Sequence, residues 1–235
     1  MKFKNSQDSW EINLSKDVTD IGIKISGGAD SAIVTYMLAK YVTEERPDIT
    51  IHPVTGIADI KPYQLIFADQ VLRKVEDLTG VVFAQHQFGS VRATHYTEDQ
   101  LTLTRSLKYG KNLFTMHFNG ITANPTQADA PHLYNNEAVP ERIKQASKKN
   151  NHRRPLINID KRGVAEHYTR LGVLEELFPV TRSCEEITTD FSKHCEVCWF
   201  CAERHWGFGR YVQVPRYKSN TLRSYTKLSS QLSYV

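Results

Sequence analysis

Residues 21 to 42 read IGIKI, SGGADS and AIVTYMLAKYV, which is a buried strand, a glycine turn and a helix in immediate succession. Paired glycines let a ligand approach the backbone closely, and the turn aims the free N–H groups of a helix's first turn at an anion. The spacing fits neither Gly-x-x-x-x-Gly-Lys-Ser/Thr nor Gly-x-Gly-x-x-Gly. The stretch therefore predicts a phosphate cradle of another kind, and the alternative is a plain strand-to-helix turn with a capping serine.

The run Ser-Gly-Gly-x-Asp-Ser after a strand resembles the pyrophosphate loop of the N-type ATP pyrophosphatases. That resemblance implies cleavage of ATP between its α and β phosphates, and hence adenylation of a substrate instead of transfer of the γ-phosphoryl group. The phosphate-binding residues carried over by position are Ser26, Gly27, Gly28, Asp30 and Ser31.

Composition bounds the class of protein. The chain has 235 residues, of which 40% are hydrophobic, so we expect one main domain with a small appended module at most. A formal charge of +4 suits an enzyme of anionic substrates without indicating nucleic-acid binding. No apolar run reaches the length of a membrane helix and the polar N-terminus does not resemble a signal peptide, so we expect a soluble, cytoplasmic protein.

Strand and helix patterns alternate from residue 21, which predicts an α/β fold with a parallel sheet and flanking helices. Expected strands are 21–25, 49–54, 81–84, 112–118 and 155–159, and expected helices are 32–42, 63–78, 97–109 and 160–171. Residues 122–154 break this rhythm and are expected to form a substrate-facing or mobile loop. Its basic run, 148–154, is read as solvated loop charge, with a nucleic-acid patch as the alternative.

All four cysteines lie within eighteen residues, a clustering that favours a metal site over a disulfide framework. Cys184, Cys195, Cys198 and Cys201 would form a closed tetrahedral zinc site with a structural role. A [4Fe-4S] cluster also accepts four cysteines, and a redox pair and chance buried thiols are weaker alternatives. The flanking His194 and His205 are expected to be surface or supporting groups and not ligands.

The predicted division is an ATP-binding α/β domain at 1–180 and a four-cysteine zinc-binding segment with an irregular tail packed on it at 181–235.

The loop and the cysteines together resemble the 7-cyano-7-deazaguanine (preQ0) synthase family. Further matching segments are Pro155-Leu156-Ile157, Asp160-Lys161, Leu171-Gly172-Val173, Thr181-Arg182-Ser183-Cys184, Cys201-Ala202-Glu203-Arg204 and Gly207-Phe208. The resemblance implies a ligase, active in queuosine or related deazaguanine biosynthesis, that converts 7-carboxy-7-deazaguanine and ammonia to the nitrile through two ATP-dependent activations assisted by Mg²⁺. It makes Asp30 a catalytic residue and Lys161 a phosphate or acyl-oxygen partner, although a solvated Lys161 is an equal alternative.

The middle of the chain departs from the family. Where the family grips its substrate, this chain has GITANPTQADAP from Gly120 to Pro131, so the acceptor remains open. Asn124, Gln127 and Asp129 are candidates for hydrogen bonds to a purine-like edge, or they are turn formers. Expected partners are a small deazapurine acid and ammonia, which is free or supplied by a partner because Met1-Lys2 excludes an N-terminal cysteine glutaminase. A homodimer is compatible with the family, and neither a membrane nor direct nucleic-acid binding is expected.

Two other functions fit part of the pattern. An ATP-dependent RNA thiolase would need a catalytic or iron–sulfur cysteine and an RNA surface, for which the basic run is the only support. A non-catalytic nucleotide-binding module stabilised by zinc would keep the loop without its chemistry.

Overall fold

The computed structural model describes residues 1–58, 61, 63–134, 148–149, 152–186 and 193–211. Its centre is a sheet in the order β5-β4-β3-β6-β8-β7. The first five of these strands are mutually parallel, and β7 pairs antiparallel with β8 at the edge. The strands are β3 (Asp20–Lys24), β4 (Thr50–Ala58), β5 (Gln87–Val91), β6 (Met116–Phe118), β7 (Lys148–Lys149) and β8 (His152–Arg153). The predicted α/β fold is confirmed.

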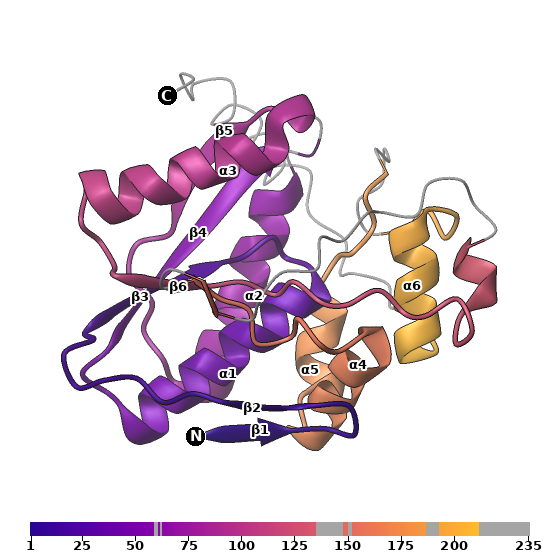
Figure 1. Cartoon of the computed structure of the whole chain (residues 1–235), viewed down its shortest axis with the longest axis horizontal. Helices are drawn as coiled ribbons and strands as arrows, with labels where there is room; N and C mark the ends of the chain where they lie inside the picture. Colours follow the sequence, from indigo (N-terminus) through magenta and orange to yellow (C-terminus); the bar gives the residue numbers. More distant parts are fainter. Residues whose placement is uncertain (59–60, 62, 135–147, 150–151, 187–192, 212–235) are drawn as a thin grey trace.

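Helices cover both faces of this sheet (Figure 1). They are α1 (Ala29–Glu45), α2 (Tyr63–Thr79), α3 (Tyr96–Arg105), α4 (Lys161–Arg170), α5 (Leu174–Leu177) and α6 (Trp199–Phe208). α1 packs against α2 and α4, whereas α3 lies across β4 and β5 on the other face, where Gln100 and Leu103 approach Gly56 and Gly89. α6 packs against α4.

Residues 21 to 42 form β3, an inner strand of the sheet, the loop after it and most of α1. Ile21, Ile23 and Ile25 are at most 2% exposed, and every residue from 31 to 39 in α1 is buried. α1 is therefore surrounded by the sheet and its neighbouring helices, and its N-terminus is fixed by packing and not by helix propensity alone.

Three strand predictions need correction. Residues 81–84 are not a strand, because only Val81 is buried and Val82 is 84% exposed, and β5 begins at Gln87 instead. Residues 155–159 form turns in place of a strand, and their apolar Leu156 and Ile159 enter the core from those turns. The strand expected at 112–118 shrinks to β6. At 155–159 the apolar residues are buried without joining the ladder, since tertiary packing overrides local propensity.

The N-terminal residues form a small hairpin that the sequence did not predict, β1 (Lys2–Lys4) paired with β2 (Ser9–Glu11). Phe3 stacks on Trp10 with ring centroids 5.6 Å apart, and Trp10 contacts Phe118 of the sheet.

The expected helix at 97–109 corresponds to α3 and a following π-helical turn, Ser106–Gly110. The irregular tail after residue 211 and much of the expected 122–154 loop lie outside the described residues, and the division at residue 180 stays a prediction. No helix in the described ranges is long and apolar enough to cross a membrane.

Candidate functional site

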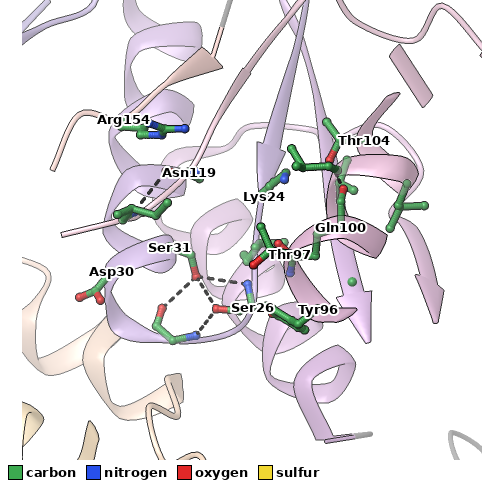
Figure 2. A pocket seen from close by; sticks show the side chains of 18 of the residues that line it. Lys24, Ser26, Asp30, Ser31, Tyr96, Thr97, Gln100, Thr104, Asn119 and Arg154 are labelled. Atoms are coloured by element: carbon green, nitrogen blue, oxygen red, sulfur yellow. Dashed lines mark hydrogen bonds between the residues drawn. The ribbon is translucent and has the colours of Figure 1, made fainter. Parts of the chain in front are cut away.

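The predicted phosphate loop joins β3 to α1, at the carboxyl edge of the parallel strands (Figure 2). Its serines fold it onto itself: the Ser31 hydroxyl donates to the Gly28 carbonyl (3.1 Å) and accepts from the Ser26 backbone N–H (3.3 Å). α1 begins after Gly28 without a side-chain cap. The N–H groups of its first turn therefore point at a position suited to an anion.

Two glycines allow this loop to pack as closely as it does. Gly27 has a φ of +79°, and a Cβ there would lie 2.3 Å from Cβ of Phe67 in α2. A Cβ at Gly120, which follows β6, would lie 2.5 Å from the backbone of Asp30 and Ser31. The loop is also held by a hydrogen bond from the backbone N–H of Arg182 to the carbonyl of Gly27 (2.9 Å). It is fixed from three sides by elements distant in sequence.

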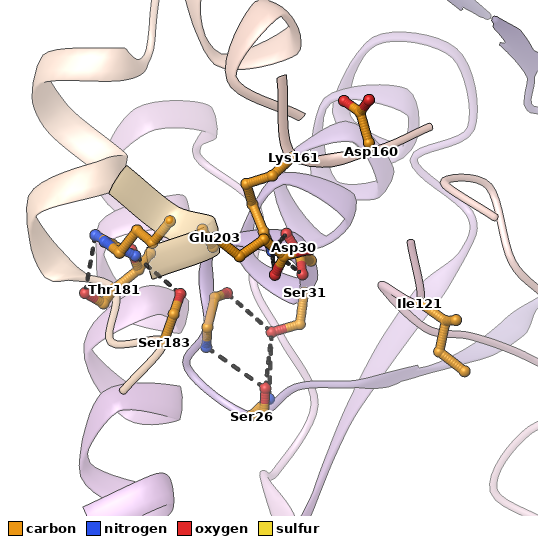
Figure 3. A network of polar contacts seen from close by, with 12 residues as sticks. Ser26, Asp30, Ser31, Ile121, Asp160, Lys161, Thr181, Ser183 and Glu203 are labelled. Atoms are coloured by element: carbon orange, nitrogen blue, oxygen red, sulfur yellow. Dashed lines mark hydrogen bonds and ion pairs between the residues drawn. The ribbon is translucent and has the colours of Figure 1, made fainter. Parts of the chain in front are cut away.

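Lys161 and Asp30, the two residues predicted to be catalytic, form an ion pair in which Lys161 is buried and Asp30 is partly exposed (Figure 3). Lys161 Nζ lies 2.6 Å from each carboxylate oxygen of Asp30 and 3.3 Å from Oε2 of Glu203, and its side chain is 3% exposed. The solvated alternative for Lys161 is therefore wrong. Because its three donors face these two carboxylates, Lys161 first of all positions Asp30.

A small polar pocket of about 150 Å³ lies between the loop and the C-terminal segment. Its walls include Ser26, Gly28 and Asp30 on one side and Arg182 and Cys184 on the other. The Arg182 guanidinium stacks near the rings of Tyr63 and Phe67, 5.1 and 5.8 Å from their centroids. Sequence reasoning assigned no site role to Arg182 or Glu203, although both stand in the segments that carried the family resemblance.

A larger cleft of about 410 Å³ opens from the same loop between the sheet and α3 (Figure 2). α3 contributes Thr97, Gln100 and Thr104 to it, and the sheet side contributes Lys24, Asn119 and Arg154. Its volume is in the range of small-molecule sites, about 300–1,000 Å³. The phosphate loop thus lies where two adjoining cavities meet.

Of the three polar candidates in the 120–131 segment, none lines either cavity. Gln127 and Asp129 are exposed, and Asp129 exchanges hydrogen bonds with Thr126 as a turn former does. The part of this segment that reaches the larger cleft is Gly120 and Ile121, directly after Asn119.

His152 lines the sheet end of the larger cleft and stacks on the buried His117. The rings of His117 and His152 are 4.1 Å apart, and the Arg154 guanidinium donates to Nδ1 of His152 (3.2 Å). Burial and the neighbouring cations lower the pKa of His117 to about 2 and that of His152 to about 4. Burial, together with the charge of Arg154, also lowers the pKa of Lys24 to about 8. This wall carries strong positive potential while its imidazoles stay neutral.

The four cysteines lie together, with their Sγ atoms within 4.8 Å of one another. Sγ of Cys195 and Cys201 are 3.8 Å apart, and the backbone N–H groups of Cys195 and Cys198 point at Sγ of Cys184 and Cys195 (3.4 and 3.3 Å). Four thiolates at about 2.3 Å from one ion stand about 3.8 Å apart, so the group fits a single tetrahedral metal. A cubane binds each thiolate to a different iron and needs wider spacing. His194 is buried, contrary to the surface alternative, and is not part of the sulfur group.

Comparisons with known proteins give a broad likeness of fold. No family model and no curated protein matches the chain. Among solved structures, the U34-tRNA thiolase NcsA from Methanococcus maripaludis with its [4Fe-4S] cluster is similar, with 15% identity over 93% of this chain and 75% of that chain and a TM-score of 0.42. NAD+ synthetase from Burkholderia pseudomallei is similar with 13% identity over 91% and 81% and a TM-score of 0.36.

The close packing at Gly27 predicts an unequal effect of two glycine substitutions. Gly27 and Gly80 both have positive φ, +79° and +72°, but only Gly27 would bring a Cβ into contact with its surroundings. Gly80→Ala should cost about 1–2 kcal/mol from backbone strain alone. Gly27→Ala should cost about 2–5 kcal/mol because steric overlap adds to that strain. Urea unfolding measures both values, and equal losses would contradict the packing described for the loop.

The neutral histidines predict a loss of stability in mild acid. The pKa values of both histidines are lower in the folded protein than in the unfolded chain. Below about pH 6.5 the unfolded state therefore binds more protons than the folded state, and the free energy of unfolding decreases as the pH is lowered. Each histidine that stays neutral contributes a loss of up to about 2 kcal/mol between pH 7 and pH 5. His117→Phe should reduce that loss by about 1–2 kcal/mol in chemical unfolding at both pH values. An unchanged pH dependence in the variant would show that folding does not lower the pKa of His117.

Proposed function

We propose that this chain is an ATP-dependent ligase that activates a carboxylate by adenylation. The observation that carries the proposal is the loop Ser26–Ser31, whose uncapped helix N-terminus lies between a small polar pocket and a larger cleft. The small pocket fits a pyrophosphate group beside Lys161 and Arg182, and the larger one fits an adenosine and an acceptor. The Ser-Gly-Gly-x-Asp-Ser motif, the uncapped N-terminus of α1 and the two adjoining cavities all support a nucleotide site here.

The chemistry explains why both cavities are needed. A carboxylate is a poor electrophile, because its charge repels an amine and oxide is a poor leaving group. Attack of a carboxylate oxygen on the α-phosphorus forms the acyl–AMP bond and breaks the bond to pyrophosphate, which leaves. Attack of ammonia on the acyl carbon then forms the amide and releases AMP and a proton. The loop N–H groups would hold the departing pyrophosphate as its charge develops.

Asp30 has the chemistry for a Mg²⁺ ligand, since its carboxylate lines both cavities next to the loop. Such an ion would offset charge on the phosphates. Lys161 contacts both oxygens of that carboxylate and is itself paired with Glu203, so this pairing would hold Asp30 in place for the ion.

For the acceptor we propose 7-carboxy-7-deazaguanine, with ammonia as the second substrate and 7-cyano-7-deazaguanine as the product. The support is the set of segments shared with the preQ0 synthases, several of which meet at the site: Lys161, Thr181–Cys184, Glu203 and Gly207. Gly207 belongs to this set because a Cβ there would lie 2.3 Å from Cγ of Lys161. A second activation, on the amide oxygen, would allow loss of that oxygen as the nitrile forms.

The decisive incubation contains the protein, ATP, Mg²⁺, ammonia and 7-carboxy-7-deazaguanine, with products read by mass spectrometry. We expect AMP, pyrophosphate and the nitrile. AMP without nitrile would indicate another acceptor. Absence of ATP cleavage with any acid would contradict the ligase proposal and favour a non-catalytic nucleotide-binding module.

Asp30→Ala should lower the rate of AMP formation by at least about 100-fold, because the variant loses the carboxylate beside the phosphates. Metal bound at the cysteines should be retained, which separates loss of chemistry from loss of folding. Retained activity would remove Asp30 from the mechanism.

For the cysteine group we propose one structural zinc ion. The spacing of the sulfurs supports a single ion, and a closed set of four thiolates leaves no position for a reacting water. Purified protein should be colourless with one zinc per chain by elemental analysis, and Cys195→Ser should lower both zinc content and melting temperature. A brown protein containing iron would contradict this assignment.

An RNA thiolase is the second candidate, and one observation favours it. Cys184 lines the small pocket together with Ser26 and Asp30, so a sulfur of the proposed metal site would lie beside the proposed phosphate site. Iron in the purified protein, with sulfur incorporation into RNA in place of nitrile formation, would select this function.

A further inference from the structure

The sheet side of the larger cleft carries a row of three polar groups on adjacent strands. Ile23, Phe118 and Arg153 are in register across β3, β6 and β8, so the residues that follow them, Lys24, Asn119 and Arg154, end those strands side by side. All three line the cleft, as does His152 (Figure 2). The row comes from three segments far apart in the sequence.

Charge in the cleft is strongly one-sided. Of the described residues that line it, Asp30 is the one with a carboxylate, and Asp30 is already paired with Lys161. Arg154 is 7% exposed, and its charge disfavours protonation of Lys24. The buried Lys108 adds a further positive charge near His117. Two cations that face one partly buried cleft repel each other and have lost water, and an anion between them relieves both costs.

The position of the row relative to the loop identifies which anion it suits. Lys24 precedes Ser26 by two residues on one continuous backbone, and both line the same cleft. A carboxylate held at Lys24 would therefore lie beside phosphates held at the loop. Because a carboxylate approaching a triphosphate is repelled, cations on the acceptor's side lower the barrier to its attack.

We propose that Lys24, Asn119 and Arg154 form the site that binds the reacting carboxylate of the acceptor, so that the enzyme takes up a small acid as its anion. This inference rests on the proposed ligase function. It assigns acceptor specificity to the ends of three strands and not to the 122–131 segment. Arg154 supplies planar paired donors, Lys24 a point charge, and the Asn119 amide a neutral hydrogen bond.

The test compares an acid with its neutral isostere. Isothermal titration gives Kd for 7-carboxy-7-deazaguanine, for its 7-carboxamide and for α,β-methylene-ATP, on wild-type protein, Lys24→Met and Arg154→Gln. Lys111→Met is the matched control, because it removes the same charge from an exposed position outside the cleft. We expect Lys24→Met to weaken binding of the acid by about 10- to 100-fold, the worth of one charged hydrogen bond. Binding of the amide and of the ATP analogue should stay within about 3-fold, and the control should change none of the three.

The outcomes separate this inference from the ligase proposal. Wild-type protein that binds the ATP analogue but does not prefer the acid to the amide overturns the inference and leaves the nucleotide site standing. Weaker binding of the ATP analogue in Lys24→Met, with acid binding unchanged, assigns the row to a phosphate of the nucleotide and also overturns it. Arg154→Gln should repeat the selective loss, and its retained affinity for the ATP analogue shows that the variant is folded. Failure of the wild-type protein to bind the ATP analogue contradicts the proposed function itself.

Discussion

The pairing of the buried Lys161 with Asp30 and Glu203 is the interaction on which the rest of the site depends. It joins the first turn of α1, the start of α4 and the interior of α6, three elements that the sequence places far apart. Burying one cation with two carboxylates is not a source of stability in itself, because desolvation offsets much of the attraction. What it provides is position: the Asp30 carboxylate is held beside the phosphate loop before any ligand arrives, and Gly207 leaves the room that Lys161 needs.

The C-terminal segment extends this positioning to the opposite wall of the small pocket. Arg204 is fully buried over the ring of Phe178 and donates to the hydroxyls of Thr181 (2.9 Å) and Ser183 (3.0 Å). Those bonds fix the extended residues that bring Arg182 to the Gly27 carbonyl and Cys184 to the sulfur group. A metal at the cysteines would therefore support the phosphate site at a distance, by holding the segment that closes it. Preorganisation of this kind reduces the ordering that binding must otherwise impose.

Local sequence pattern predicted the parts of the molecule that are local. A buried strand, two glycines and a helix follow one another directly, so the β3–loop–α1 unit could be predicted from residues 21 to 42. The cysteine group was equally visible from spacing. Glu203, Arg182 and the row at Lys24 could not be placed in this way, because they meet through the register of parallel strands and the packing of α6 on α4. The prediction at 155–159 failed because Leu156 and Ile159 reach the core from turns, and the one at 81–84 failed because Val82 is exposed.

In the proposed reaction, ATP bound at Ser26–Ser31 is cleaved between its α and β phosphates. Phosphorus-31 NMR of ATP incubated with the protein, Mg²⁺, ammonia and 7-carboxy-7-deazaguanine tests it directly, because AMP with pyrophosphate and ADP with inorganic phosphate give different resonances. We expect AMP and pyrophosphate in equal amounts, formed by the wild-type protein and lost in Asp30→Ala. ADP and inorganic phosphate as the products would contradict it.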